Sequence, residues 1–225
     1  SDNKREKSLI KSSCEIANVH YFEGPRTYPV DNWNKLLKMV NTPFFVLNHH
    51  DEYPDNLDFL DELDNEKLGL LILPCSSKVP GRNFHNIETW QQYIFTKFCR
   101  LFNNASFNML LAPTASVIVS NDLKDILFDK NLKWYVDAEW YLKLFNEVKF
   151  KKFKTKFYPF SRVFSIQASN SITLSLKNRL KEQIKYEKKY LNSIGLFPGE
   201  FINLIQFFCL AAILFKTKLK QLFGL

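Results

Sequence analysis

The sequence predicts an α/β fold in which a mostly parallel sheet is flanked by helices. Continuous apolar runs at residues 44–47 and 68–73 are typical of strands buried on both faces. Segments with apolar residues three and four positions apart, typical of helices, alternate with these runs. The chain has 225 residues and is 46% hydrophobic, so it is long enough to build one such domain around a sizeable core.

The individual elements follow from local signals. Asp31 can cap a helix, and Thr42-Pro43 ends it because proline cannot continue the hydrogen-bond ladder. Pro74 likewise ends the second apolar run. Helices are expected at 31–40, 87–102 and 132–145, and strands at 19–22, 44–47, 68–73 and 115–120.

The charge is unevenly distributed. The formal net charge is +8, but the residues from Lys143 to the end carry +12 and the preceding ones carry −4. This asymmetry predicts a polyanionic partner, either nucleic acid or anionic lipid headgroups. The alternative is a lysine-rich solvated surface. We expect a catalytic region over residues 1–170 and a basic, apolar helical region over residues 171–225.

The end of the chain resembles a membrane-surface helix. Residues 201–215 are mainly apolar and are followed by Lys216, Lys218 and Lys220. The stretch is shorter than the ~20 residues that a membrane-spanning helix needs, so we expect an interfacial helix on an anionic membrane surface. The alternative is a helix packed on the core or in a dimer interface. The predicted location is the cytoplasm, with peripheral association at the inner face of the membrane.

Several site types lack their sequence signatures. The four cysteines are widely spaced, with no CxxC pair or zinc-ligand pattern, which favours free thiols in a reducing cytosol. The chain contains 6 glycines and neither a P-loop nor a GxGxxG motif. Any phosphate group must therefore be held in another way.

Two acidic clusters are candidates for chemistry. The first, Asn48-His49-His50-Asp51-Glu52, follows a predicted strand, where ligands bind in open α/β sheets. Its carboxylates and imidazoles could bind a divalent cation, and alternate residues such as His49 and Asp51 can point to one side. A polar turn without a ligand is the alternative, and a zinc hydrolase would need further ligands.

The second cluster is Asp137 and Glu139. Two residues apart on a helix, they do not face each other and need not share a role. One could act as a general base, which takes the proton of an attacking hydroxyl. The alternative is a pair of carboxylates that interact with the helix dipole.

The order of these motifs resembles bacterial family 2 glycosyltransferases of the GT-A type. Residues 31–40 resemble the NWN helix of that family, and the turn after the next strand resembles its DxD motif, with His49 and Asp51 at the two acidic positions and Glu52 after them. Asp137, six residues before Lys143, matches the catalytic aspartate that precedes an arginine in the family. The resemblance covers about residues 1–170.

The first residues also resemble a family motif. Ser1-Asp2-Asn3 is similar to the nucleotide-binding motif, and the resemblance implies that Asp2 and Asn3 contact the nucleotide. It also implies that the family's first strand would precede Ser1, so we expect a catalytic domain that lacks this strand. The sequence departs from the family pattern at Lys4-Arg5, which replace Gly-Ser, and at His49, which replaces the first DxD aspartate.

The resemblance implies an inverting, metal-dependent glycosyltransferase. A nucleotide-diphosphate sugar would be the donor, and a saccharide or lipid-linked saccharide the acceptor, in cell-surface polysaccharide or lipid-linked glycan synthesis. Asp51, with His49 or Glu52, would hold Mn²⁺ or Mg²⁺, and Asp137 would be the catalytic base. Nucleic acid is not an expected partner. The alternatives are a catalytically inactive GT-A-like protein and a basic nucleic-acid-binding protein.

Overall fold

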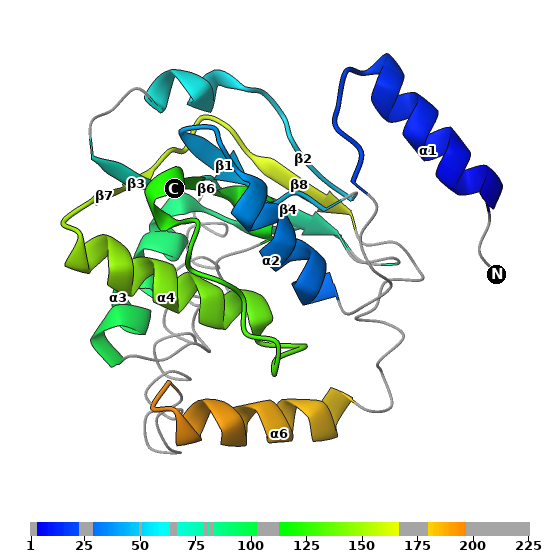
Figure 1. The fold of residues 1–225 in the computed structure, drawn as a ribbon. Helices are drawn as coiled ribbons and strands as arrows, with labels where there is room; N and C mark the ends of the chain where they lie inside the picture. The colour runs from blue at the N-terminus through cyan, green and yellow to red at the C-terminus, as the bar shows by residue number, and fades with distance from the viewer. Residues whose placement is uncertain are drawn as a thin grey trace.

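A computed structural model of the chain describes residues 4–22, 29–49, 51–63, 67–78, 81, 83–102, 113–166 and 180–196. These parts form a mixed α/β structure with two four-stranded sheets (Figure 1). The described helices are α1 (Lys4–Ile16), α2 (Pro29–Met39), α3 (Thr89–Phe102), α4 (Val136–Phe150) and α6 (Leu180–Ser193). The strands are β1 (Phe44–Val46), β2 (Glu52–Pro54), β3 (Leu68–Ile72), β4 (Cys75–Lys78), β5 (His85–Ile87), β6 (Val117–Ser120), β7 (Lys154–Phe157) and β8 (Val163–Ile166).

The first sheet has the strand order β1-β6-β3-β7, and the second has the order β2-β8-β4-β5. In the first sheet β6 is antiparallel to both β1 and β3, whereas β3 and β7 are parallel. In the second sheet only β4 and β8 are parallel. The prediction of an α/β fold is confirmed, but that of a mostly parallel sheet is wrong, because both sheets are mixed. Three strands of the first sheet nevertheless run in one direction, since β6 is reversed between β1 and β3.

Strand β3 forms the centre of the fold. All five of its residues are buried. Leu70 and Ile72 pack into a core with α2 and α4, and Leu71 packs into a second core with β4 and β8. The continuous apolar run therefore correctly predicted a strand covered on both faces.

Gly69 allows close packing beneath β3. A Cβ atom at this position would lie 2.8 Å from Phe153 Cβ and 2.9 Å from a Val148 methyl group. The register with β7 also shifts between Leu68 and Leu70. Only a residue without a side chain lets the end of α4 approach the strand this closely.

Two of the predicted strands differ from expectation, the one at 44–47 in its burial and the one at 19–22 in its conformation. Strand β1 is only partly buried, and Val46 is 45% exposed, because β1 lies at one end of its sheet as described and pairs with β6 alone. Residues 19–22 were expected to form a strand, but they are irregular and pair with neither described sheet. Val19 and Phe22 are both at least half exposed, so no hydrophobic burial favours an extended pairing there.

Short strands account for most of what the sequence pattern missed. Strands β2, β4, β5, β7 and β8 are three or four residues long and carry mixed polar and apolar residues. Within 87–102, where a helix was expected, the chain first completes β5 and then begins α3 at Thr89. Short strands with exposed faces give too little periodicity to be distinguished from loops.

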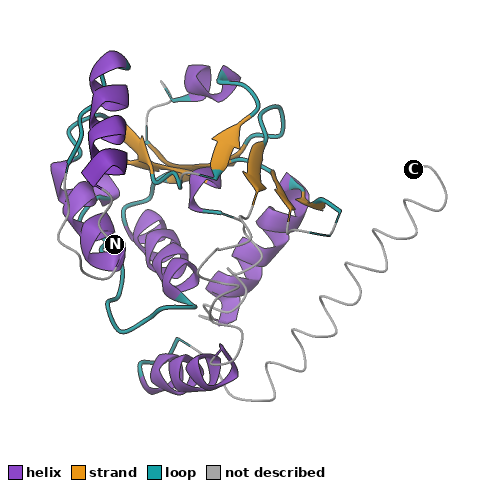
Figure 2. Cartoon of the chain, turned by 90° about the vertical axis from the view of Figure 1, so that its right-hand side faces the viewer, coloured by secondary structure: helices purple, strands orange, loops and turns teal. Residues whose placement is uncertain are grey.

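Helix α6 packs against the remainder of the fold, on the side of α4 (Figure 1). Its Leu191 is fully buried in the core that contains α4, whereas Tyr186 is 59% exposed. Figure 2 shows the described helices around the strands from a second direction. Among the described residues, no helix is both long and apolar enough to cross a bilayer. Residues 197–225, where the interfacial helix is predicted, and the boundary near residue 170 lie outside the described residues.

Candidate active site

The turn between β1 and β2 is held by its own hydrogen bonds. The Asn48 side chain donates to the backbone carbonyls of His49 and Glu52, each at 2.9 Å. The Glu52 carboxylate accepts from the backbone N–H groups of His49 and Ala115, each at 3.3 Å. Glu52 therefore joins this turn to the short helix η3 (Thr114–Ser116), which precedes β6.

Helix α2 supports this turn from one side. The indole of Trp33 makes edge contacts with the rings of His49 and Phe128, each with centroids 5.3 Å apart. Asn34 is buried and exchanges two hydrogen bonds with the backbone of Phe128, at 2.8 and 3.0 Å. The Phe128 ring also stacks on Trp140 of α4, with centroids 4.4 Å apart. The Asn-Trp-Asn segment thus connects α2 to both the His49 turn and α4.

Asp137 is the second residue of helix α4. The charges of His49 and Glu52, at the β1–β2 turn, act on its carboxylate. Although the residue as a whole is partly accessible, its Oδ1 atom is inaccessible and has no hydrogen-bond partner in the described part of the chain. Burial raises the pKa of Asp137 to about 6; His49 acts to lower this pKa and Glu52 to raise it. The structure therefore brings together Asp137, His49 and Glu52, which come from two distant parts of the sequence.

Tyr141 is an additional member of this cluster. It lies one helical turn after Asp137 and is almost completely buried. Burial, followed by the charges of Asp137 and Glu52, raises the pKa of its phenol, which stays protonated near neutral pH. Tyr141 was not predicted as a site residue, although its spacing of four residues from Asp137 places both on one helix face.

Glu139 has different surroundings from Asp137. It is 1% exposed and forms an ion pair with Lys143, at 2.6 Å. Burial raises the pKa of Glu139, and Lys143 partly opposes that change. The Lys143 ammonium also donates to the Leu127 carbonyl, at 3.2 Å. Glu139 thus differs from Asp137 in having a cation on one oxygen, while its other oxygen, Oε2, is inaccessible and has no hydrogen-bond partner among the described residues.

The predicted metal ligands do not form a ligand set in the structure. Glu52 accepts two backbone hydrogen bonds, and the His49 ring packs on Trp33. The backbone carbonyl of Asp51 accepts from Ile166, at 2.9 Å. Over the part of the chain that the structure describes, no group of three or more His, Cys, Asp or Glu side chains is arranged to hold a metal ion. The residues present therefore do not fit a bound cation as they stand.

Asp2 and Asn3, expected to bind a nucleotide, lie outside the described residues, as does His50. Cys75 is a free, buried thiol whose pKa burial raises to about 12, so the thiol stays protonated near neutral pH. Cys14 is also free and is partly exposed.

No protein-family model matches the sequence, and no curated protein matches it significantly.

Proposed function

We propose that this chain is a glycosyltransferase of the GT-A type that transfers a sugar from a nucleotide-diphosphate donor to an acceptor hydroxyl. The observation that carries the proposal is Asp137, a carboxylate with an inaccessible, unpartnered Oδ1 atom and a pKa raised to about 6. A base with a pKa close to the working pH is efficient, because it is largely ionised and still takes a proton readily. The position of Asp137 also corresponds to the catalytic aspartate in the resemblance noted above.

In this proposal Asp137 accepts the proton of the acceptor hydroxyl. The hydroxyl oxygen forms a bond to the anomeric carbon as the bond from that carbon to the diphosphate oxygen breaks. The nucleoside diphosphate leaves with the bonding electron pair, and attack from the opposite face inverts the anomeric configuration. His49 and Glu52 set the electrostatic environment of the base, and Trp33 holds His49 in place.

The strand arrangement gives further support for the proposal. The turn that carries His49 follows β1, which lies at the end of the first sheet as described. Asp137 comes from α4, which follows β6 later in the chain. Polar residues after a sheet strand are a common location for ligand sites in α/β proteins. The acceptor proposed is a saccharide or a lipid-linked saccharide, used at the inner face of a membrane.

The metal remains a separate prediction. By the resemblance, Asp51 with His49 or Glu52 would hold Mn²⁺ or Mg²⁺, but the described geometry does not fit such a site. No step of the proposed reaction is therefore routed through a metal. Measuring nucleotide binding with and without Mn²⁺ tests this point independently of catalysis.

The test of the proposal is release of nucleoside diphosphate from a panel of UDP-, GDP- and CDP-sugars, with saccharide acceptors supplied. We expect one donor class to turn over, and Asp137→Asn to slow turnover by about 10²–10⁴-fold without loss of nucleotide binding. Loss of binding together with turnover would contradict the general-base role. If the parent chain neither binds nor turns over any nucleotide sugar, the proposal is wrong.

A further inference from the structure

The amino end of α4 has an unusual cap. Tyr135 occupies the N-cap position, and its side chain does not cap the helix. The first backbone N–H groups of a helix have no partner within it and are normally satisfied by a side chain of the N-cap residue. For this helix a side chain from a distant element instead binds the N–H group of the N-cap residue and those of the two residues before it.

Glu187 of α6 caps α4 from outside, at the N-cap residue Tyr135 and the two residues before it. Its carboxylate accepts from the backbone N–H groups of Lys133 at 2.8 Å, Trp134 at 2.9 Å and Tyr135 at 2.8 Å. Gln183, one turn earlier on α6, donates to the same carboxylate. Glu187 is completely buried. Three N–H donors and the positive end of the α4 dipole compensate the cost of burying this charge.

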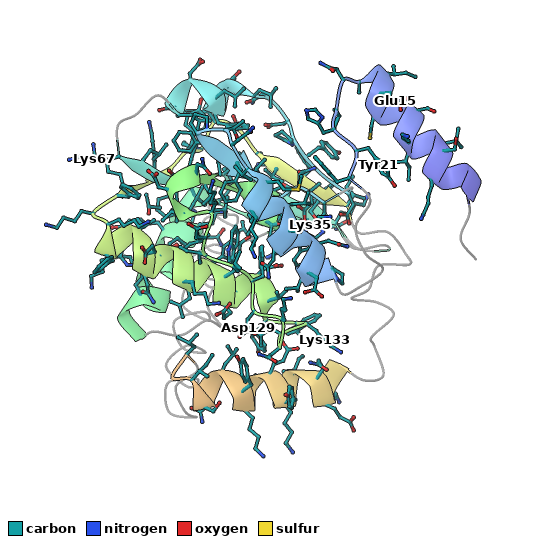
Figure 3. The ribbon with its side chains drawn as sticks, in the orientation of Figure 1. Glu15, Tyr21, Lys35, Lys67, Asp129 and Lys133 are labelled. Carbon is teal, nitrogen blue, oxygen red and sulfur yellow. The ribbon has the colours of Figure 1, made fainter. Side chains whose placement is uncertain are left out.

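Additional contacts keep α6 in this position. Leu191 is fully buried in the core next to α4. The Tyr190 hydroxyl donates to the Asp129 carboxylate, at 2.6 Å, and accepts from Asn131, at 3.3 Å. Asp129 and Lys133 lie on the segment that faces α6 (Figure 3). The segment that leads into α4 is therefore fixed by α6 over residues 129–135.

We propose that Glu187 is a positioning residue for Asp137. Asp137 is the second residue of α4, two positions after the last N–H group that Glu187 accepts. Its side-chain direction depends on the first turn of the helix, and that turn begins where Glu187 holds the backbone. The inference rests on the proposed function for the role of Asp137, whereas the capping itself is independent of that function.

The experiment compares Glu187→Ala with Leu191→Ala in the full chain. Both residues are fully buried on α6, but of the two only the Glu187 side chain accepts hydrogen bonds from the backbone before α4. Hydrogen exchange reports the cap directly, because the amides of 133–135 donate to Glu187. We expect Glu187→Ala to accelerate exchange at 133–139 at least about tenfold relative to 140–150, as a local opening of the helix end. Leu191→Ala should lower overall stability without this local difference.

Turnover of the nucleotide-sugar panel gives the second measurement. We expect kcat of Glu187→Ala to fall by about 10²-fold with KM for the donor within about twofold, since a misplaced base slows the chemical step without affecting donor binding. Glu187→Gln keeps an acceptor oxygen and should recover part of both effects. It also replaces the alanine variant if that variant does not fold.

The possible outcomes are distinct. Exchange at 133–139 that rises no more than in Leu191→Ala would overturn the capping role. Local acceleration with unchanged kcat would overturn the positioning role. If the parent chain turns over no nucleotide sugar, the proposed function and with it the positioning of a catalytic base are wrong, while the exchange comparison still decides whether Glu187 caps α4.

Discussion

Two carboxylates at the amino end of α4 have opposite surroundings. Glu187 is completely buried and accepts from three backbone N–H groups. Asp137 has an inaccessible Oδ1 atom without a partner in the described structure. A buried charge with several donors can stabilise the fold, whereas an unpartnered one costs free energy. Burial alone therefore does not determine the cost of these two carboxylates; the number of hydrogen bonds that each accepts does.

The largest expected effect is on the proposed reaction. Replacing Asp137 with Asn removes the group that would take the acceptor proton, and general bases typically contribute about 10²–10⁴-fold to rate. We expect kcat to fall by that factor while calorimetric binding of the nucleotide stays within about twofold. A rate within tenfold of the parent would show that Asp137 is not the base.

The second prediction concerns the stability that Glu187 provides. Glu187→Ala removes the carboxylate that accepts from three backbone N–H groups, of which that of Tyr135 is buried, and we expect the free energy of unfolding to fall by about 3 kcal/mol. Chemical denaturation at pH 7.5 measures this change. A loss below about 1 kcal/mol would show that water replaces the carboxylate without difficulty.

The third prediction concerns the ion pair between Glu139 and Lys143. Lys143→Met removes the cation paired with Glu139, which should lower stability at pH 7.5 by about 2 kcal/mol, less than for a fully buried pair because Lys143 is partly exposed. The double variant Lys143→Met/Glu139→Gln should recover most of that loss. If the single variant is as stable as the parent, the ion pair has no structural role.

The smallest predicted effect is a gain in stability rather than a loss, and it is expected for Asp137→Asn. In the folded state the pKa of Asp137 is raised from 3.8 to about 6, so folding disfavours its ionised form. The contribution of the neutral carboxyl is fully present below pH 3.8 and is lost as the pH rises through about 6. Asp137→Asn should therefore stabilise the protein by about 1–2 kcal/mol above pH 7, with allowance for the partial exposure of the residue.

The pH dependence checks this sign. The stabilisation by Asp137→Asn should shrink as the pH falls from 6 to 4, measured by denaturation at several pH values. A constant gain across this range would mean that the effect is not caused by ionisation of Asp137. Destabilisation at pH 7.5 would contradict the unpartnered state of the carboxylate.

The sequence predicted the elements that have strong periodicity. The apolar run in β3 and the spacing of Trp33 and Leu37 in α2 were sufficient, because burial patterns of long or fully buried elements are visible locally. The second sheet was missed, since its short strands are defined by pairing with distant segments.

The candidate site was predictable only in part, because its assembly also depends on contacts between distant segments. Asp137, His49 and Glu52 were identified by residue type and motif order, but their proximity depends on how α4 packs. Glu187 was not identified, since one acidic residue in a lysine-rich segment resembles a solvated helix face until α6 is placed. Its capping role involves partners more than fifty residues away.

The central claim is tested most directly by calorimetric titration of the chain with UDP, GDP and CDP, each with and without Mn²⁺. The account predicts that one nucleotide binds, that Asp137→Asn binds it equally well, and that any gain from Mn²⁺ is lost in Asp51→Ala. Absence of binding to all three, together with polynucleotide binding that weakens steeply with salt, would contradict the transferase proposal and favour a nucleic-acid-binding protein.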